Sequence, residues 1–187
     1  MARRADEANR SGLLDRIVSY ALMNGVAALS LRPLAKDLGV SAAALIYHFG
    51  SKEELTVEIL KHAGDSQRAL FASMHVGASE SPRDICREVW RVIGAPQARP
   101  LFRLFFEVYG LALIDPGRFP GFFPNAITNW LDFLERTYVS DGCDARAARV
   151  RATIVIAGFR GFLLDVCATG DDERVASAVE LWLETLP

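Results

Sequence analysis

The stretch LSLRPLAKDLGVSAAALIYHFGSKEEL, residues 29–55, decides how this chain folds. Ser30 can cap a helix over residues 31–38, and Pro33 falls in the first turn of that helix, where a missing N–H group is tolerated. Gly39 ends the helix, because glycine readily adopts the left-handed conformation of a helix C-terminus. The first half of the stretch therefore predicts a helix of about two turns followed by a tight turn.

The second half of the stretch predicts another short helix and the start of a third. Ser41 can cap a helix over residues 42–49, which ends at Gly50. The Ser-x-x-Glu pattern of Ser51–Glu54 is a capping box, so a further helix begins at Lys52. Two short helices joined by a turn that contains glycine form a helix-turn-helix, the arrangement that many DNA-binding proteins use. From this pattern alone, an ordinary helical hairpin is the alternative.

The rest of the chain is also predicted to be helical. Apolar residues between Leu14 and Leu22 recur every three or four positions, and Asn24-Gly25 ends that first helix. No segment alternates as a strand would, so the fold class is all-α. Loops are expected at 76–82, 95–100 and 115–124, and further helices at 84–93, 101–114, 126–138, 145–168 and 172–186.

Composition excludes several classes of protein. A net charge of −2 over 187 residues argues against coating nucleic acid through bulk charge. The three widely spaced cysteines argue against a disulfide framework or a zinc site, and no metal or cofactor is expected. The N-terminus lacks the apolar core of a signal peptide. The most apolar stretch, 152–167, is too short to span a bilayer and is interrupted by Arg160 and Asp165, which predicts a cytoplasmic protein.

Residues 29–55 resemble the DNA-binding signature of the TetR family of bacterial regulators. The matching pieces are Leu34-Ala35, Leu38-Gly39-Val40-Ser41, Leu45, His48-Phe49 and Ser51-Lys52-Glu53-Glu54-Leu55. The resemblance favours the helix-turn-helix over the hairpin. It implies a three-helix DNA-binding module, residues 1–52, followed by a helical effector-binding and dimerisation domain, residues 53–187. It also implies a transcriptional regulator, usually a repressor released by a small molecule.

By this resemblance, one short helix reads bases in the major groove, and its neighbours hold the DNA backbone. Arg32 is the best candidate for a base-specific contact, worth about 1–3 kcal/mol if it is bidentate; the alternative is a surface arginine paired with Asp37. Lys52 and the free N–H groups of its helix can clamp a phosphate. The expected DNA-binding residues are Arg32, Ser41, Ala42, Ala43, Ala44, Tyr47, His48 and Lys52.

The expected reading helix departs from the family pattern in two ways. The family usually has Leu-Tyr-x-His-Phe, whereas this chain has Leu45-Ile46-Tyr47-His48-Phe49, so one contact is lost or has moved to Tyr47. Its first turn is three alanines, which can touch thymine methyl groups but cannot form hydrogen bonds through their side chains. Direct hydrogen-bonded readout should therefore be weak, and the alternative is that alanine is present only as a good helix former.

Aromatic residues concentrate in the C-terminal part. Stripes of this kind usually belong to a core, but ligand pockets between helices are also apolar with a few polar groups. The resemblance implies an effector, and the aromatic content favours a hydrophobic or aromatic one over a sugar or a metal ion. The expected effector-binding residues are Phe102, Phe105, Phe106, Tyr109, Phe122, Phe123, Asn125, Trp130 and Phe159.

The last two helices are apolar on more than one face, which suggests that a second chain covers them. On the final helix Val175, Val179, Trp182 and Leu186 align, beside Ala178 and Leu181. The partners expected are thus a second copy of the chain, a palindromic operator in double-stranded DNA, and a small effector. The alternatives are a helical lipid- or small-molecule-binding protein that does not bind DNA, a thiol sensor, and an enzyme, for which no catalytic motif is present.

Overall fold

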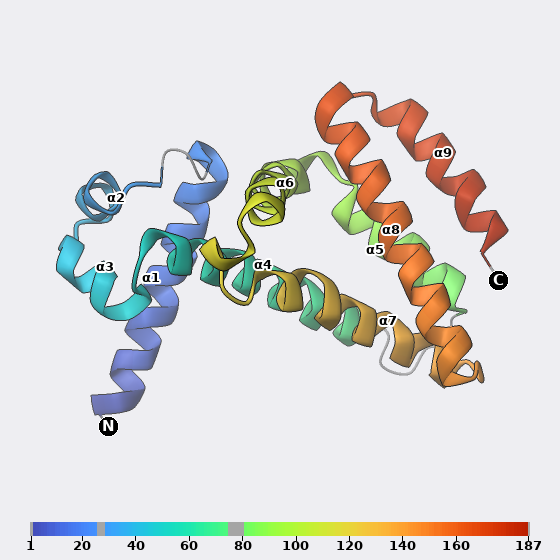
Figure 1. Cartoon of the computed structure of the whole chain (residues 1–187), viewed down its shortest axis with the longest axis horizontal. Coiled ribbons are helices and arrows are strands. Elements are labelled where there is room, and N and C mark those ends of the chain that lie inside the picture. Colours follow the sequence, from blue (N-terminus) through green and yellow to red (C-terminus); the bar gives the residue numbers. More distant parts are fainter. Residues whose placement is uncertain (1, 26–28, 75–80, 187) are drawn as a thin grey trace. The chain divides into compact units, whose positions relative to one another are not determined.

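The computed structural model describes the backbone of residues 2–25, 29–74 and 81–186, and this part of the chain contains helices and connecting turns but no strand (Figure 1). The predicted all-α fold is confirmed. The elements are α1 (Ala2–Asn24), α2 (Leu31–Leu38), α3 (Ala42–Phe49), α4 (Lys52–Met74), α5 (Pro82–Ile93), η1 (Pro96–Ala98), α6 (Arg99–Ile114), η2 (Pro116–Arg118), a π-helical turn η3 (Pro124–Thr128), α7 (Asn129–Ser140), α8 (Ala145–Thr169) and α9 (Asp172–Thr185).

The chain forms two compact units, each with its own core. Unit 1 contains residues 1–63 and 103–122, and unit 2 contains residues 64–102 and 123–187, so α4 and α6 each contribute to both. The predicted domain boundary at residue 52 coincides with the start of α4, but which segment folds and binds DNA independently stays a prediction.

In unit 1, α2 and α3 begin and end at the predicted residues. Gly39 has φ 67° and ψ 30°, the left-handed conformation that the turn requires. Leu34 and Leu45 are fully buried and hold the two helices together. Ser30 lies at the predicted N-cap position of α2 and has the extended backbone of an N-cap residue. Its side chain makes no capping hydrogen bond.

Unit 2 is organised around the long helix α8, which packs against α5, α7 and α9. By length and apolar composition α8 could cross a membrane. Seven of its residues are nevertheless buried within the unit: Ala148, Ala152, Val155, Ile156, Phe159, Leu163 and Val166. One helix that meets these criteria is weak evidence for a membrane span, because helices of soluble proteins meet them too.

The final helix corrects one prediction. Val175 and Val179 are buried within unit 2, whereas Ala178 and Leu181 are exposed. The face of α9 left without a cover is therefore the one that carries Ala178 and Leu181. The prediction also placed Val175, Val179, Trp182 and Leu186 on an uncovered face. Val175, Val179 and Leu186 are instead buried on the side that packs into the unit, and Trp182 is half-buried.

Prolines explain most of the shifted helix boundaries. Helix α5 begins at Pro82, two residues earlier than predicted, because proline is tolerated in a first turn and Ser81 caps it through the Asp84 N–H group. The break predicted at 95–100 contains η1 and the start of α6. The predicted helix over 126–138 begins as η3, in which the Asn129 N–H donates to the Pro124 carbonyl. Of the loop predicted at 76–82, residues 76–80 lie outside the described residues.

Candidate nucleic-acid interface

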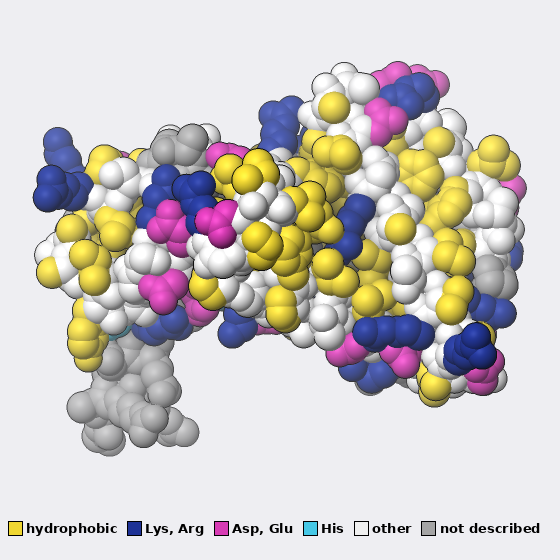
Figure 2. All heavy atoms as spheres, in the orientation of Figure 1, with side chains coloured by type: hydrophobic (Ala, Val, Ile, Leu, Met, Phe, Trp, Pro, Cys, Tyr) yellow, Lys and Arg dark blue, Asp and Glu magenta, His cyan; other side chains and the backbone are white. Residues whose placement is uncertain are grey.

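The outer face of α3 is formed by the residues that do not pack against α2. Leu45 and Phe49 are buried, so the opposite side of this two-turn helix presents Ala43, Ile46 and Tyr47, which share one face at three- and four-residue spacing. Ile46 is 54% exposed and Tyr47 is 80% exposed. In Figure 2, hydrophobic side chains cover the outer side of α3, and Lys and Arg side chains project beside them over α2.

The ends of α3 are fixed by hydrogen bonds that its sequence predicted. The Ser41 hydroxyl oxygen accepts from the Ala44 N–H at 3.0 Å. After Gly50, the Ser51 N–H donates to Glu54 Oε2 at 2.7 Å and the Glu54 N–H donates to Ser51 Oγ at 3.1 Å, which is a reciprocal capping box. These bonds hold the pKa of Glu54 below its usual value, and the bond from the Ser51 N–H has the largest effect. The caps orient α3 relative to α4.

Three cations surround this face. Arg32 and Lys36 are exposed on α2, four residues apart and so on the same side of the helix. Lys52 is half-buried at the first position of α4. Within the described part of the chain, no hydrogen bond or ion pair holds any of these three side chains, and Arg32 does not pair with Asp37. The charges are therefore available to an anionic partner.

Two other arginines in unit 1 are used to hold the module together, a role that the sequence did not reveal. Arg10 donates to Glu58 at 3.1 Å and to the His48 carbonyl at 3.4 Å, and its guanidinium lies 4.9 Å from the centre of the Phe49 ring. Arg16 donates to the Leu38 carbonyl at 2.6 Å, at the end of α2. The bonds to the His48 and Leu38 carbonyls join α1 to the helix-turn-helix, and the bond to Glu58 joins α1 to α4, so only the fold brings these residues together.

His48 is half-buried between the rings of Tyr47 and Phe49, whose centres lie 5.0 Å and 6.0 Å from its own. Among the described residues, no three His, Cys, Asp or Glu side chains are grouped so that they could hold a metal ion. His48 therefore lies at the edge of the exposed α3 face, without the neighbouring ligands that a metal site needs.

A family model for bacterial regulatory proteins, tetR family, matches residues 14–59, the segment from the buried face of α1 into α4. Solved structures extend the likeness to nearly the whole chain. A TetR-family regulator from Pectobacterium atrosepticum is 18% identical, with a TM-score of 0.73 over 98% of this chain and 96% of its own. A TetR regulator from Legionella pneumophila is 21% identical, with a TM-score of 0.67 over 90% and 94%. Residues 14–59 therefore match the DNA-binding segment of the TetR family, and the chain as a whole is similar in fold to TetR-family regulators.

The match to the family model supports a DNA-binding transcriptional regulator with a helix-turn-helix. A third similar structure is that of the multidrug binding protein EbrR complexed with proflavin, which is 21% identical, with a TM-score of 0.59 over 91% of this chain and 97% of its own. No curated protein matches the chain.

The predicted effector residues of this chain are divided between the two units. In unit 1, the rings of Phe105, Tyr109 and Phe122 contact one another, with centres 5.6–5.9 Å apart, and Phe106 lies 5.3 Å from Phe105. Phe122 is buried and the other three are half-buried. They form one aromatic cluster, as core and pocket residues both do, so their role in effector binding stays a prediction.

In unit 2, Phe159 is part of a second aromatic cluster. Its ring stacks on Trp90 at 5.9 Å and meets the edge of Trp182 at 5.4 Å. Helix α9 lies close to α8 at this cluster. A Cβ atom added at Gly158 on α8 would lie 2.3 Å from the Trp182 ring, so this close approach requires glycine. The sequence analysis did not assign Trp90 to this cluster, since nothing in the spacing of α5 shows which helix it meets.

The other predicted effector residues of unit 2 lie elsewhere. Trp130 has the Arg68 guanidinium 5.3 Å from its ring centre. The Asn129 amide donates to Asn125 at 3.0 Å, one turn earlier. Phe102 and Phe123 are half-buried. The two asparagines are thus a polar pair at the junction of η3 and α7.

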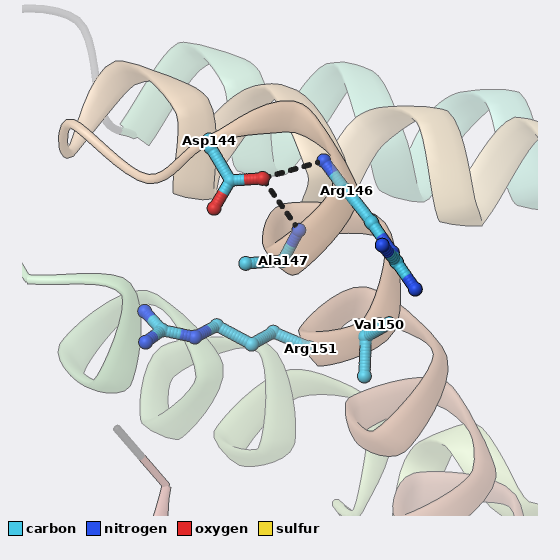
Figure 3. Close-up of a pocket in the computed structure, with 5 residues that line it drawn as sticks. All are labelled: Asp144, Arg146, Ala147, Val150 and Arg151. Atoms are coloured by element: carbon cyan, nitrogen blue, oxygen red, sulfur yellow. Dashed lines mark hydrogen bonds between the residues drawn. The ribbon is translucent and has the colours of Figure 1, made fainter.

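One shallow hollow of about 290 Å³ lies at the start of α8, lined by Asp144, Arg146, Ala147, Val150 and Arg151 (Figure 3). Asp144 accepts from the Arg146 and Ala147 N–H groups, both at 3.1 Å, so the end of the helix already has its anionic partner. None of the predicted effector residues lines this hollow.

The cysteine environments bear on the thiol-sensor alternative. Cys86 is buried on α5, and burial raises the pKa of its thiol to about 12. At neutral pH this thiol is therefore protonated, and the protonated form is a poor nucleophile. Cys143 and Cys167 are half-buried, and among the described residues none of the three cysteines forms a disulfide.

Proposed function

We propose that the protein is a repressor that binds its operator as a homodimer in the cytoplasm and is released by a small hydrophobic or aromatic effector. The observation that carries the DNA half of this proposal is the set of unpaired cations around the exposed face of α3. Cations without a carboxylate partner are available to phosphates. The contacts come from Arg32, Ser41, Ala42, Ala43, Ala44, Tyr47, His48 and Lys52.

The homodimer forms through α8 and α9. From Val150 to Ala168, the exposed positions of α8 lie on one side of the helix and are small or apolar, and Ala178 and Leu181 add to this surface on α9. Leu181 is 67% exposed. A long apolar surface of this kind is typical of a subunit interface. The residues of α8 that form it are Val150, Ile154, Ala157, Gly161, Leu164 and Ala168.

The effector binds among the predicted aromatic residues and shifts the separation of the two DNA-binding modules. A dimer places its reading helices about one DNA turn apart, or a multiple of it, so a change in separation lowers operator affinity. The effector has this influence only to the extent that it binds the released state more tightly. The similar protein EbrR is a multidrug binding protein and was solved with proflavin, which supports testing hydrophobic drugs and dyes first.

Two alternatives remain in other classes. A helical carrier of lipids or small molecules would use the aromatic clusters without binding DNA. An enzyme would need a convergent group of titratable side chains, and we propose no catalytic role for any residue of this chain. Sequence-specific retention on DNA separates the proposal from both alternatives.

The deciding experiment is binding of the purified full chain to a pool of random DNA duplexes at about 0.15 M salt, with sequencing of the retained fraction. An enriched palindrome supports a dimeric regulator and supplies the operator. Proflavin and a library of hydrophobic compounds are then titrated against the protein–operator complex. Salt-sensitive retention with no enriched motif contradicts the DNA half of the proposal, and an operator complex that no compound releases contradicts the effector half.

A further inference from the structure

The chemistry of the α3 face is unusual for a helix that reads DNA, because it has few groups able to form hydrogen bonds with bases. The Ser41 hydroxyl oxygen is occupied by the Ala44 N–H. Ala43 and Ile46 have no polar side-chain atom, yet both are exposed and share one face of the helix with Tyr47. The most prominent aliphatic group on this face is Ile46.

Burial does not explain the exposed isoleucine. Leu45 and Phe49 already provide the buried contacts of α3, and both are at most 6% exposed. Ile46 is more than half exposed on α3. The neighbouring elements carry cations without a partner among the described residues, Arg32 and Lys36 on α2, which packs against α3, and Lys52 at the start of α4. An apolar side chain on a helix whose neighbours carry cations fits a partner that has anionic groups along its edges and an apolar group between them.

The major groove of B-DNA offers such a surface. Its phosphates are anionic, and the 5-methyl group of thymine is the apolar feature that base edges present there. Alanine and larger aliphatic side chains recognise thymine by contact with that methyl group, without any hydrogen bond.

We propose that Ile46, together with Ala43, reads the 5-methyl groups of thymine, so that this regulator recognises part of its operator through methyl contacts. The inference rests on the proposed DNA contacts of α3. Each half-site then contains one or two thymines whose methyl groups contribute to affinity, and Ile46 supplies the contact at one of them. A tyrosine at this position would instead bring a hydroxyl group to the groove or the backbone.

The test replaces each thymine of the selected operator in turn by deoxyuridine, which removes the methyl group and keeps the hydrogen-bonding edge. We expect operator affinity to fall about fourfold at one or two positions of each half-site and to stay unchanged elsewhere. The assignment to Ile46 is tested with Ile46→Ala. In this variant the loss on deoxyuridine substitution should disappear at one sensitive position, since the methyl group has no partner left.

The matched control is Ile114→Ala, the same substitution at an isoleucine that is 84% exposed on α6, outside the reading helix. This variant should keep the full sensitivity to deoxyuridine. Both isoleucines are exposed, so both variants should fold, and thermal unfolding followed by circular dichroism checks this. A variant Ile46→Val, which keeps part of the aliphatic surface, should keep part of the sensitivity.

The outcomes separate this inference from the function on which it depends. If the wild-type protein binds its operator specifically but no deoxyuridine substitution weakens it, methyl recognition is wrong and the DNA-binding function stands. If the sensitivity is present and survives in Ile46→Ala, the assignment to Ile46 is wrong. If no duplex is retained in a sequence-specific way, the proposed α3 contacts fail, and this inference fails with them.

Discussion

Two regions of this protein expose apolar side chains, and the charges around them differ. The face of α3 is short and lies among Arg32, Lys36 and Lys52, none of which has a partner in the described residues. The exposed side of α8 and α9 is long. Arg149 and Arg174 beside it are paired, whereas the exposed Arg146 at its start has no side-chain partner among the described residues. Arg174 binds Asp165 at 2.6 Å, and Arg149 binds Asp132 at 2.6 Å.

The difference shows that exposed apolar surface alone does not identify a partner. Unpaired cations around an apolar face favour an anionic polymer, because contact with phosphates releases condensed counterions. Paired ions around an apolar face offer no such gain and leave burial of apolar area as the driving force, as in an interface between subunits. On this basis we assign α3 to DNA and α8 with α9 to a second copy of the chain.

The largest expected effect comes from placing a charge on the longer face. Leu181→Arg should weaken dimerisation about 100-fold or more, because the two-fold interface would bury two unpaired guanidinium groups. Sedimentation velocity over a concentration series measures the effect. The control is Ala176→Arg, which adds the same charge to α9 at an exposed position on the side away from Ala178 and Leu181. If both variants dimerise as tightly as the wild type, the α9 surface is not the interface.

The cations around α3 should have the next largest effect. Arg32→Ala and Lys52→Ala should each weaken operator binding about tenfold, and loss of a phosphate contact should reduce the slope of log affinity against log salt by about one. If Arg32 contacts a base, its variant should also relax the preference at one operator position. Fluorescence anisotropy at several salt concentrations makes both measurements. Arg149→Ala, which removes a paired arginine, should leave operator affinity and slope unchanged; an equal loss there would contradict the comparison.

The turns on either side of α3 differ in the strain that a side chain would cause. Gly50→Ala should lower the free energy of unfolding by about 1–3 kcal/mol. Its backbone has φ 72° and ψ −135°, and a Cβ atom there would lie 2.2 Å from the Glu54 carboxylate. Gly39→Ala should cost less, about 1 kcal/mol, because its left-handed conformation is less strained and the space around it is open. Urea denaturation compares the two, and equal losses would contradict this account.

The smallest expected effect concerns the capping box. The pKa of Glu54 is lowered in the folded protein, so the stability that its carboxylate contributes is present above its unfolded pKa and is lost as pH falls through the folded pKa. The wild type should therefore be more stable than Glu54→Gln at pH 7, and the difference should shrink at about pH 3. Urea denaturation at both pH values measures it. A difference that is the same at both values would mean that the charge of Glu54 does not matter.

Local signals accounted for the DNA-binding module. Glycines, capping serines and one proline set the limits of α2 and α3, because helix ends depend on a few residues adjacent in the chain. The same reasoning misplaced the start of α5 and missed η3, where proline removes a backbone donor and several arrangements of the following turn are available. It also did not predict the contacts of Arg10 and Arg16 within the module, because their acceptors lie 22 to 48 positions away in the sequence.

The sequence by itself determined the helical class, the helix-turn-helix and the family resemblance, since these depend on periodicity and on residues that are neighbours in the chain. Only the tertiary structure decided which apolar side chains are left exposed. It buried Val175 and Val179, left Leu181 uncovered, and left Ile46 exposed on a helix whose neighbours carry unpaired cations. The physical reason is that an amphipathic pattern shows that a face is apolar, whereas the packing of distant helices determines what covers it.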